Sequence, residues 1–274
     1  MGDLDSPLIT GDTARVADVT GRVLASGFAL ALASAALGLG AGDAGGDEAG
    51  SRPIAAEPTA RTTQRRPLRF TTSDLFIEIN ATDGDAGLQM NLGGVTWQRL
   101  TVRDPRGRPI VDVAGEGRLK DYGLTDLMFE SNEPPFDEVP YRRFKARFPE
   151  GRYTFRGTTI EGRSVTGSDR LTHDVPERPR IRVPAEDAAV DPAAFVVRWD
   201  RVTRPRGIRI IRYQVIVTAE TDTRVLSMDL GPGARSAAIA PEFLEPGGAY
   251  AVEVIARERS GNQTITEVPF RTRR

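Results

Sequence analysis

Residues 244–256 read LEPGGAYAVEVIA, and this stretch decides the fold of the C-terminal third of the chain. Pro246 and the two glycines after it form a turn, and a strand-like run follows as far as Ala256. A tyrosine at such a corner buries its ring between two sheets and hydrogen-bonds its hydroxyl to nearby backbone. We therefore expect Leu244 and Tyr250 to lie in the core of a β-sandwich.

The sequence on both sides of this corner supplies further strands. Strand-like runs cover residues 195–199, 212–220, 225–230 and 263–272. Here the chain resembles the fibronectin type III family, with Trp199 at the position of the family's core tryptophan and Tyr213 at that of its third-strand tyrosine. Leu244, Pro246 and Tyr250 are similar to its Leu-x-Pro…Tyr corner. The resemblance covers residues 176–274, and it implies a sandwich of a kind that generally acts as a spacer or a binding surface.

A second series of strands, over residues 68–175, lies outside this resemblance. Leu75, Ile77 and Ile79 alternate with other residues, which predicts a strand with one buried face. The pattern also predicts a strand over 95–102 with a bulge at Gln98–Arg99, a type I turn at 104–107 leading to a strand over 110–113, strands over 152–156, 158–160 and 165–171, and a helix over 140–148. We expect a β-rich, sandwich-like first domain, joined to the second by a stiff junction at Pro176, Pro179 and Pro184.

Residues 1–41 have the layout of an export signal. Arg15 and Arg22 precede an uncharged run over residues 23–41, and the small residues 33–35 suit a signal-peptidase site. An uncleaved membrane anchor and a buried Ala-rich helix are the alternatives. Residues 42–67 contain almost no large apolar side chains and predict a disordered linker.

Composition excludes several classes of site. The chain has no cysteine and a single histidine, His173, so disulfides, thiol nucleophiles, Cys-ligated metals and paired imidazoles are excluded. The 37 basic and 38 acidic residues are well mixed, which argues against a nucleic-acid surface. No Gly-x-Ser-x-Gly elbow or phosphate-binding loop is present. We therefore predict no catalytic, cofactor-binding or metal-binding residue.

One turn leaves calcium as an open alternative. Asn80, Asp83 and Asp85 place oxygen-bearing side chains close together, and a hard cation such as Ca²⁺ prefers such ligands. The EF-hand pattern is not met, and Asp-Gly-Asp between two strands also suits an ordinary hairpin turn. The plain turn is the favoured interpretation.

The segment 126–138, DLMFESNEPPFDE, is the richest in carboxylates mixed with aromatic residues. Two carboxyl groups of unequal pKa would permit glycoside hydrolysis without a histidine. A solvated acidic loop is the alternative, and a cleft that brings two carboxylates such as Glu130 and Glu133 together would favour the enzyme. Trp97 would suit stacking on a sugar, but a residue of an alternating strand is more often directed inward.

The sequence as a whole predicts an all-β protein of two tandem sandwiches. Its predicted role is an exported, non-catalytic binding, adhesion or scaffolding protein with a protein or glycan ligand, no nucleic-acid partner and no cofactor. Contact with a membrane is expected only if the N-terminal segment stays uncleaved. The alternative is a carbohydrate-acting enzyme, or a carbohydrate-binding accessory, that uses residues 126–138.

Overall fold

Alternating apolar residues build nearly all of the secondary structure in this chain. The computed structural model describes residues 66–222 and 224–274, which belong to one compact unit and form sixteen strands and a single α-helix. The all-β prediction is therefore confirmed. The predictions for the export signal over residues 1–41 and for most of the linker concern residues outside the described ranges. In the part that the structure describes, no helix is long and apolar enough to cross a membrane.

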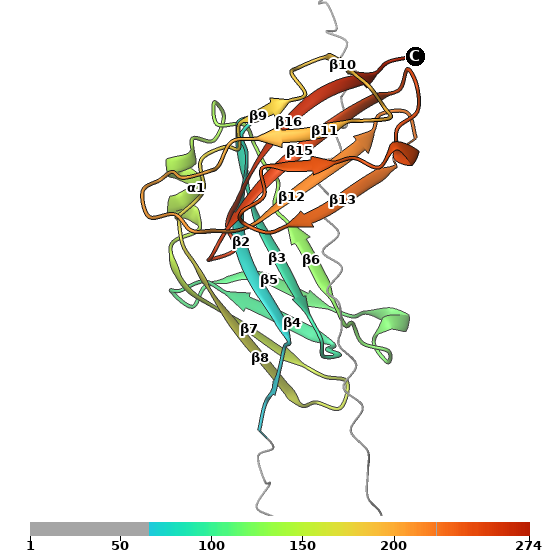
Figure 1. Cartoon of the computed structure of the whole chain (residues 1–274). Coiled ribbons are helices and arrows are strands. Elements are labelled where there is room, and N and C mark those ends of the chain that lie inside the picture. The colour runs from blue at the N-terminus through green and yellow to red at the C-terminus, as the bar shows by residue number, and fades with distance from the viewer. Residues whose placement is uncertain (1–65, 223) are drawn as a thin grey trace, which may run out of the picture. The chain divides into compact units, whose positions relative to one another are not determined.

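The first eight strands enclose one core. They are β1 (Leu68–Arg69), β2 (Thr72–Asn80), β3 (Asp85–Gly93), β4 (Arg99–Arg103), β5 (Pro109–Ala114), β6 (Leu127–Glu130), β7 (Gly151–Thr158) and β8 (Ser164–Leu171). One sheet has the order β1-β8-β7-β4-β5, and β2-β3-β6 belong to another (Figure 1). Buried residues of both sheets, among them Ile77, Leu88, Leu100 and Phe155, form one hydrophobic cluster. This group is a sandwich, as predicted.

The second group of strands forms another sandwich. Its members are β9 (Ile181–Val183), β10 (Ala188–Val190), β11 (Val196–Trp199), β12 (Ile210–Ala219), β13 (Val225–Leu230), β14 (Ser236–Ala238), β15 (Ala249–Glu258) and β16 (Gln263–Thr272). A three-stranded sheet, β14-β11-β9, shares its core with β13-β12-β15-β16, and β10 pairs with β16. This is the fibronectin type III-like fold that the sequence predicts for this part of the chain.

The residues that carry the resemblance lie in this core. Trp199 and Tyr213 are buried with ring centroids 5.5 Å apart, and the backbone N–H of Val202 donates to the Tyr213 hydroxyl at 2.9 Å. Leu244 and Tyr250 are also buried, and the N–H of Glu245 donates to the Tyr250 hydroxyl at 2.7 Å. The predicted tyrosine corner is therefore confirmed.

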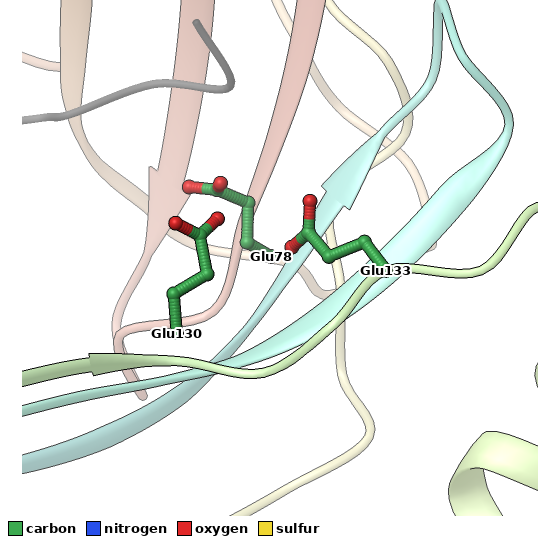
Figure 2. A group of neighbouring side chains, drawn as sticks. All are labelled: Glu78, Glu130 and Glu133. Atoms are coloured by element: carbon green, nitrogen blue, oxygen red, sulfur yellow. The ribbon is translucent and has the colours of Figure 1, made fainter. Parts of the chain in front are cut away.

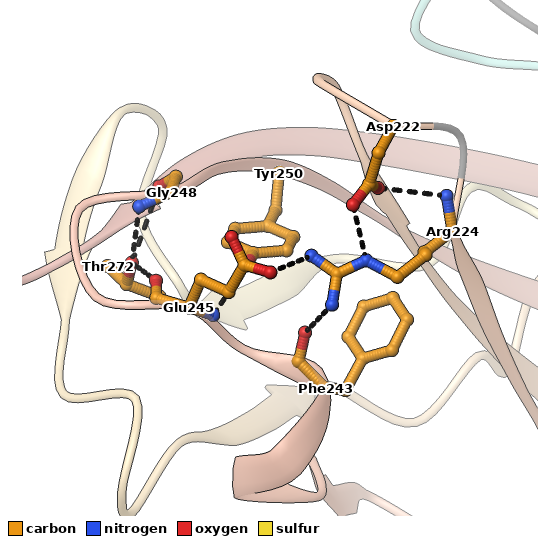
Figure 3. A network of polar contacts seen from close by, with 7 residues as sticks. All are labelled: Asp222, Arg224, Phe243, Glu245, Gly248, Tyr250 and Thr272. Carbon is orange, nitrogen blue, oxygen red and sulfur yellow. Dashed lines mark hydrogen bonds and ion pairs between the residues drawn. The ribbon is translucent and has the colours of Figure 1, made fainter.

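A polar network surrounds this corner (Figure 3). The Arg224 guanidinium lies over the Phe243 ring and pairs with Asp222 at 2.6 Å and with Glu245 at 2.8 Å. Thr272 accepts from the N–H of Gly248 at 2.9 Å and donates to the carbonyl of Glu245. The exposed ion pairs contribute little individually, but they surround the loop that holds the corner tyrosine.

Strand pairing continues from one sandwich to the other. In β16, Gln263, Thr264 and Ile265 pair in parallel with Glu78, Ile79 and Asn80 of β2. The sheets β13-β12-β15-β16 and β2-β3-β6 are consequently parts of one larger sheet. The proline-rich junction is also fixed to the second sandwich, since the Thr264 hydroxyl donates to the carbonyl of Pro176 at 2.7 Å.

The helix and the turn of the first sandwich follow their predictions. The helix α1 (Tyr141–Arg147) begins after Pro140 and buries Phe144. At the type I turn, the N–H of Gly107 donates to the carbonyl of Asp104 at 2.9 Å.

The strands of the first sandwich differ from the predictions in several places. The structure has β3 and β6, which are not among the predicted strands. The β3 run alternates apolar residues, but it holds two glycines and no β-branched residue. Trp97 lies outside any strand and forms only an isolated bridge with Leu124, and the irregular register lies between Val102 and Arg103 instead of at Gln98–Arg99. Residues 158–160 form no separate strand, since the N–H of Gly162 donates to the Thr159 carbonyl and closes a turn.

Candidate functional site

The strand β2 is expected to expose one of its two faces to solvent, but this second face is also buried and carries a carboxylate. Leu75 and Ile77 point into the core, yet Phe76 and Glu78 are 6% and 5% exposed. The expectation of one buried face for this strand is therefore wrong. The pairing of β2 with both β3 and β16 places it inside a sheet, where Gly87 and Gln263 flank Glu78, and the Arg257 guanidinium lies over the Phe76 ring.

Three glutamates from separate segments converge at this position. Glu78 comes from β2, Glu130 ends β6, and Glu133 lies in the loop that follows. One carboxylate oxygen of each lies within 4.8 Å of the other two, and Figure 2 shows the three carboxylates turned toward one another. We call these three residues the glutamate cluster.

Two glutamine amides hold the carboxylates of the cluster. The Gln89 amide donates to Glu130 at 2.8 Å and to Glu78 at 3.4 Å. The Gln263 amide, from the second sandwich, donates to the other oxygen of Glu78. Within residues 66–222 and 224–274, no arginine or lysine forms an ion pair with any of the three glutamates. The cluster is thus oriented by neutral donors, and the guanidinium of Arg257 acts on Glu78 through its charge without forming an ion pair with it.

Glu133 lies against the backbone of β3 at a glycine. A Cβ atom on Gly87 would lie 1.8 Å from Glu133 Oε1, so only a glycine leaves room for this carboxylate. The loop is held there by the N–H of Leu88, which donates to Ser131 Oγ at 2.9 Å, and by the N–H of Phe136, which donates to the Gly84 carbonyl at 2.8 Å. Glu133 Oε1 is itself buried and has no hydrogen-bond partner.

Burial raises the pKa values of Glu78 and Glu133. Desolvation, with the Glu130 charge as a further cause, raises the pKa of Glu78 to about 7 despite the hydrogen bond from Gln263. Desolvation and the charges of Glu78 and Glu130 raise the pKa of Glu133 to about 8. The group therefore needs either bound protons or a cation to offset its charge near neutral pH.

The three residues considered as calcium ligands, Asn80, Asp83 and Asp85, have different surroundings in the structure. The Asn80 amide donates to Asp83 Oδ2 at 2.8 Å, and Asn80 Oδ1 accepts from the N–H groups of Thr82 and Asp83. These two side chains therefore form an ordinary turn. Asp85 differs, because it is only 9% exposed and its Oδ1 is buried without a hydrogen-bond partner. Burial, followed by the charge of Asp83, raises the pKa of Asp85 to about 6.

Only some of the carboxylates in the acidic segment 126–138 belong to the glutamate cluster. Glu130 and Glu133 enter the cluster, while Asp126 lies against Gly93, and Asp137 and Glu138 are exposed. Glu78, which completes the cluster, is not among the sequence candidates. Its only signal is a carboxylate between Ile77 and Ile79, in the apolar middle of the strand.

Two other candidate residues, Trp97 and His173, are held in place by the surrounding fold and do not belong to the glutamate cluster. Trp97 is fully buried, as expected for an inward-facing residue, so it offers no surface to a sugar ring. The ring of His173 is hydrogen-bonded to the carbonyl of Phe148 at 2.8 Å, away from the cluster.

The geometry of the cluster suits a shared counter-charge better than glycoside hydrolysis. Glycosidases separate their two carboxyl groups by roughly 5–5.5 Å or roughly 6.5–9.5 Å, with the sugar between them. Here one oxygen of each carboxylate lies within 4.8 Å of the other two, and Gln89 donates hydrogen bonds to both Glu78 and Glu130.

Comparison with known proteins finds solved structures alone. No family model matches the sequence, and no curated protein matches it. The chain is similar to the crystal structure of the chicken CNTN1 FN1–FN3 domains, with 12% identity, a TM-score of 0.32, and coverage of 76% of this chain and 65% of that one. It is also similar to a two fibronectin type III domain segment from chicken tenascin, with 14% identity, a TM-score of 0.28, and coverage of 73% and 98%. The assignment of the fold rests on the strand order and the buried residues described above.

Proposed function

We propose that this protein is an exported, non-catalytic binding or scaffolding protein in which two β-sandwich domains form one rigid unit. The proposed domains are residues 68–175 and 176–274, preceded by an export signal over 1–41 and a linker over 42–67. The observation that supports this role best is the joint between the sandwiches, because a protein that only presents surfaces at a fixed spacing needs such a joint and no reactive site.

Asn262 is the centre of this joint. It is 1% exposed, and its Oδ1 accepts from the N–H of Ile77 in β2 at 2.8 Å. Its amide donates to the carbonyls of Thr172 and Asp174 at 3.0 and 2.8 Å. One side chain of the second sandwich thus satisfies backbone groups of β2 and of the segment that follows β8.

Asn262→Ala is expected to weaken the coupling between the two sandwiches. The change leaves the buried N–H of Ile77 without its acceptor, and we expect a loss of about 2–4 kcal/mol in the free energy of unfolding. Each sandwich holds one tryptophan, Trp97 or Trp199, so urea unfolding followed in Trp97→Phe and Trp199→Phe backgrounds reports each sandwich separately.

The two fluorescence transitions should coincide in the parent and separate after Asn262→Ala. Asn132→Ala, at an exposed asparagine of the first sandwich, is the matched control and should leave them together. Transitions that are already separate in the parent would show that the joint is not rigid.

The non-catalytic role is tested by one purified sample in two assays. We expect the full chain to bind a ligand on a glycan or protein array, and to turn over no glycoside or ester substrate. Turnover that disappears in both Glu130→Gln and Glu133→Gln would replace this proposal by the carbohydrate-acting enzyme. Export is tested by N-terminal sequencing of the protein from its native host, where an intact Met1 on soluble cytoplasmic protein would contradict it.

A further inference from the structure

The glutamate cluster has the properties of a binding site for a hard divalent cation, and these go beyond the proposed function. All of its potential ligands are oxygen atoms, and the chain has no cysteine to favour a softer metal. Two oxygens that bind one Ca²⁺ ion at roughly 2.3–2.6 Å cannot be more than about 5.2 Å apart. The three carboxylate oxygens, which lie within 4.8 Å of one another, satisfy this limit.

Asp85 is a separate indication of a ligand at this site. It is nine-tenths buried, and its Oδ1 has no hydrogen-bond partner. Asp85 and Gly87 are alternate residues of β3, so they face the same side of the sheet as Glu78, which pairs with Gly87. The carboxylate of Glu133 lies on Gly87, and the charge of Asp85 acts on both Glu78 and Glu133, so Asp85 lies near the cluster. The backbone of Asn80 hydrogen-bonds to the Asp85 carboxylate, but Oδ1 has no donor, and such a buried oxygen is costly unless a cation or a proton offsets the charge.

The residues next to the glutamate cluster hold its carboxylates in place, as residues around a metal site do. Gln89 and Gln263 fix the orientation of Glu78 and Glu130 through hydrogen bonds, which leaves other oxygen lone pairs of these carboxylates free to bind. Gly87 gives Glu133 the space to complete the group.

We propose that Glu78, Glu130 and Glu133, with Asp85 beside them, bind one Ca²⁺ ion that fixes the acidic loop after β6 to the sheet at the joint between the two sandwiches. Ca²⁺ fits better than Mg²⁺, because it accepts six to eight oxygens in flexible geometry, whereas Mg²⁺ demands a near-ideal octahedron. The three carboxylates of the cluster also supply the negative charge that such binding needs.

Calcium titration of the full, chelator-treated chain by isothermal titration calorimetry tests this site. We expect one equivalent to bind with a Kd of about 10⁻⁴–10⁻³ M, the range of extracellular modules. Glu133→Gln and Glu130→Gln should each weaken binding by about tenfold or more. Glu138→Gln, a change of the same kind at an exposed glutamate of the same segment, should leave the affinity unchanged.

Gly87→Ala tests the geometry without changing any charge. The added Cβ would displace the Glu133 carboxylate, so this variant should also weaken binding by about tenfold or more, and circular dichroism checks that it is folded. No saturable binding up to about 10 mM Ca²⁺ would overturn the proposal, as would equal losses in Glu138→Gln or unchanged affinity in folded Glu130→Gln and Glu133→Gln variants. Because each readout is calcium affinity, failure here leaves the proposed binding or scaffolding role untouched.

Discussion

Trp199→Ala is expected to lower the free energy of unfolding by about 3–5 kcal/mol, the cost of emptying a large aromatic site in a packed core. Trp199 is 3% exposed and lies between the two sheets of the second sandwich, against Tyr213. The surrounding strands are paired along their lengths, so they cannot collapse into the space that the indole leaves. Chemical denaturation followed by circular dichroism measures the change.

Two variants accompany this test. Tyr122→Ala also removes a large aromatic side chain, but one that is 80% exposed, so its effect should stay within about 0.5 kcal/mol. Trp199→Phe should cost less than the alanine variant, because it keeps a ring in the core and removes a buried N–H that has no acceptor. A Trp199→Ala loss below about 1.5 kcal/mol would contradict the fibronectin type III-like core.

Without calcium, the protein should become less stable as the pH rises from 5 to 8, with Glu253 as a main cause. Glu253 of β15 is buried directly opposite Glu267 of β16, and its Oε2 has no hydrogen-bond partner. Burial, followed by the charges of Glu267, Glu78 and Asp83, raises its pKa to about 8.

The sign follows from proton binding. A carboxyl group whose folded pKa exceeds its unfolded value of 4.5 binds more protons in the folded state between those two pH values. Its stabilising contribution is therefore complete below pH 4.5 and is lost as the pH rises through about 8. At about 1.4 kcal/mol for each pKa unit, the rise from 4.5 to about 8 makes the contribution of Glu253 on the order of 5 kcal/mol.

Glu253→Gln, which keeps the shape and removes the titration, should flatten this part of the profile. The variant should be more stable than the parent at pH 8 and similar to it near pH 4.5, as measured by urea unfolding in a chelator. Glu220→Gln, at an exposed position next to the end of β12, is the control and should keep the slope of the parent. A parent profile that is flat or rises from pH 5 to 8 would contradict the prediction.

The core and the longer strands of the second sandwich could be predicted from the sequence, because they depend on local information, whereas the three-residue strands β9, β10 and β14 are not among the predicted strands. The strands β13 and β16 have the ranges expected from alternation, and Trp199, Tyr213, Leu244 and Tyr250 lie in the core as the corner motif indicates. Two signals predict this core: apolar residues at every second position, and a turn of a recognisable type. Both depend on residues that are near one another in the chain.

The strand β3 shows where local information fails. Its sequence DAGLQMNLG alternates Ala86, Leu88, Met90 and Leu92 toward the core, but its glycines give it low intrinsic strand preference. Pairing with β2 along its whole length makes it a strand. Gly87, which weakens the local signal, is the residue that leaves room for the carboxylate of Glu133.

The sequence by itself determined the all-β class, the core of the second sandwich and the absence of cysteine and paired-histidine chemistry. Only the tertiary structure decided which carboxylates meet. Glu78 is buried because β16 pairs with β2, and the hydrogen bond between Glu78 and Gln263 joins residues 185 positions apart. Glu130 and Glu133 reach Glu78 because β6 pairs with β3 and the next loop folds back over Gly87. Such a group depends on strand register across the whole chain, and no local pattern of residues encodes it.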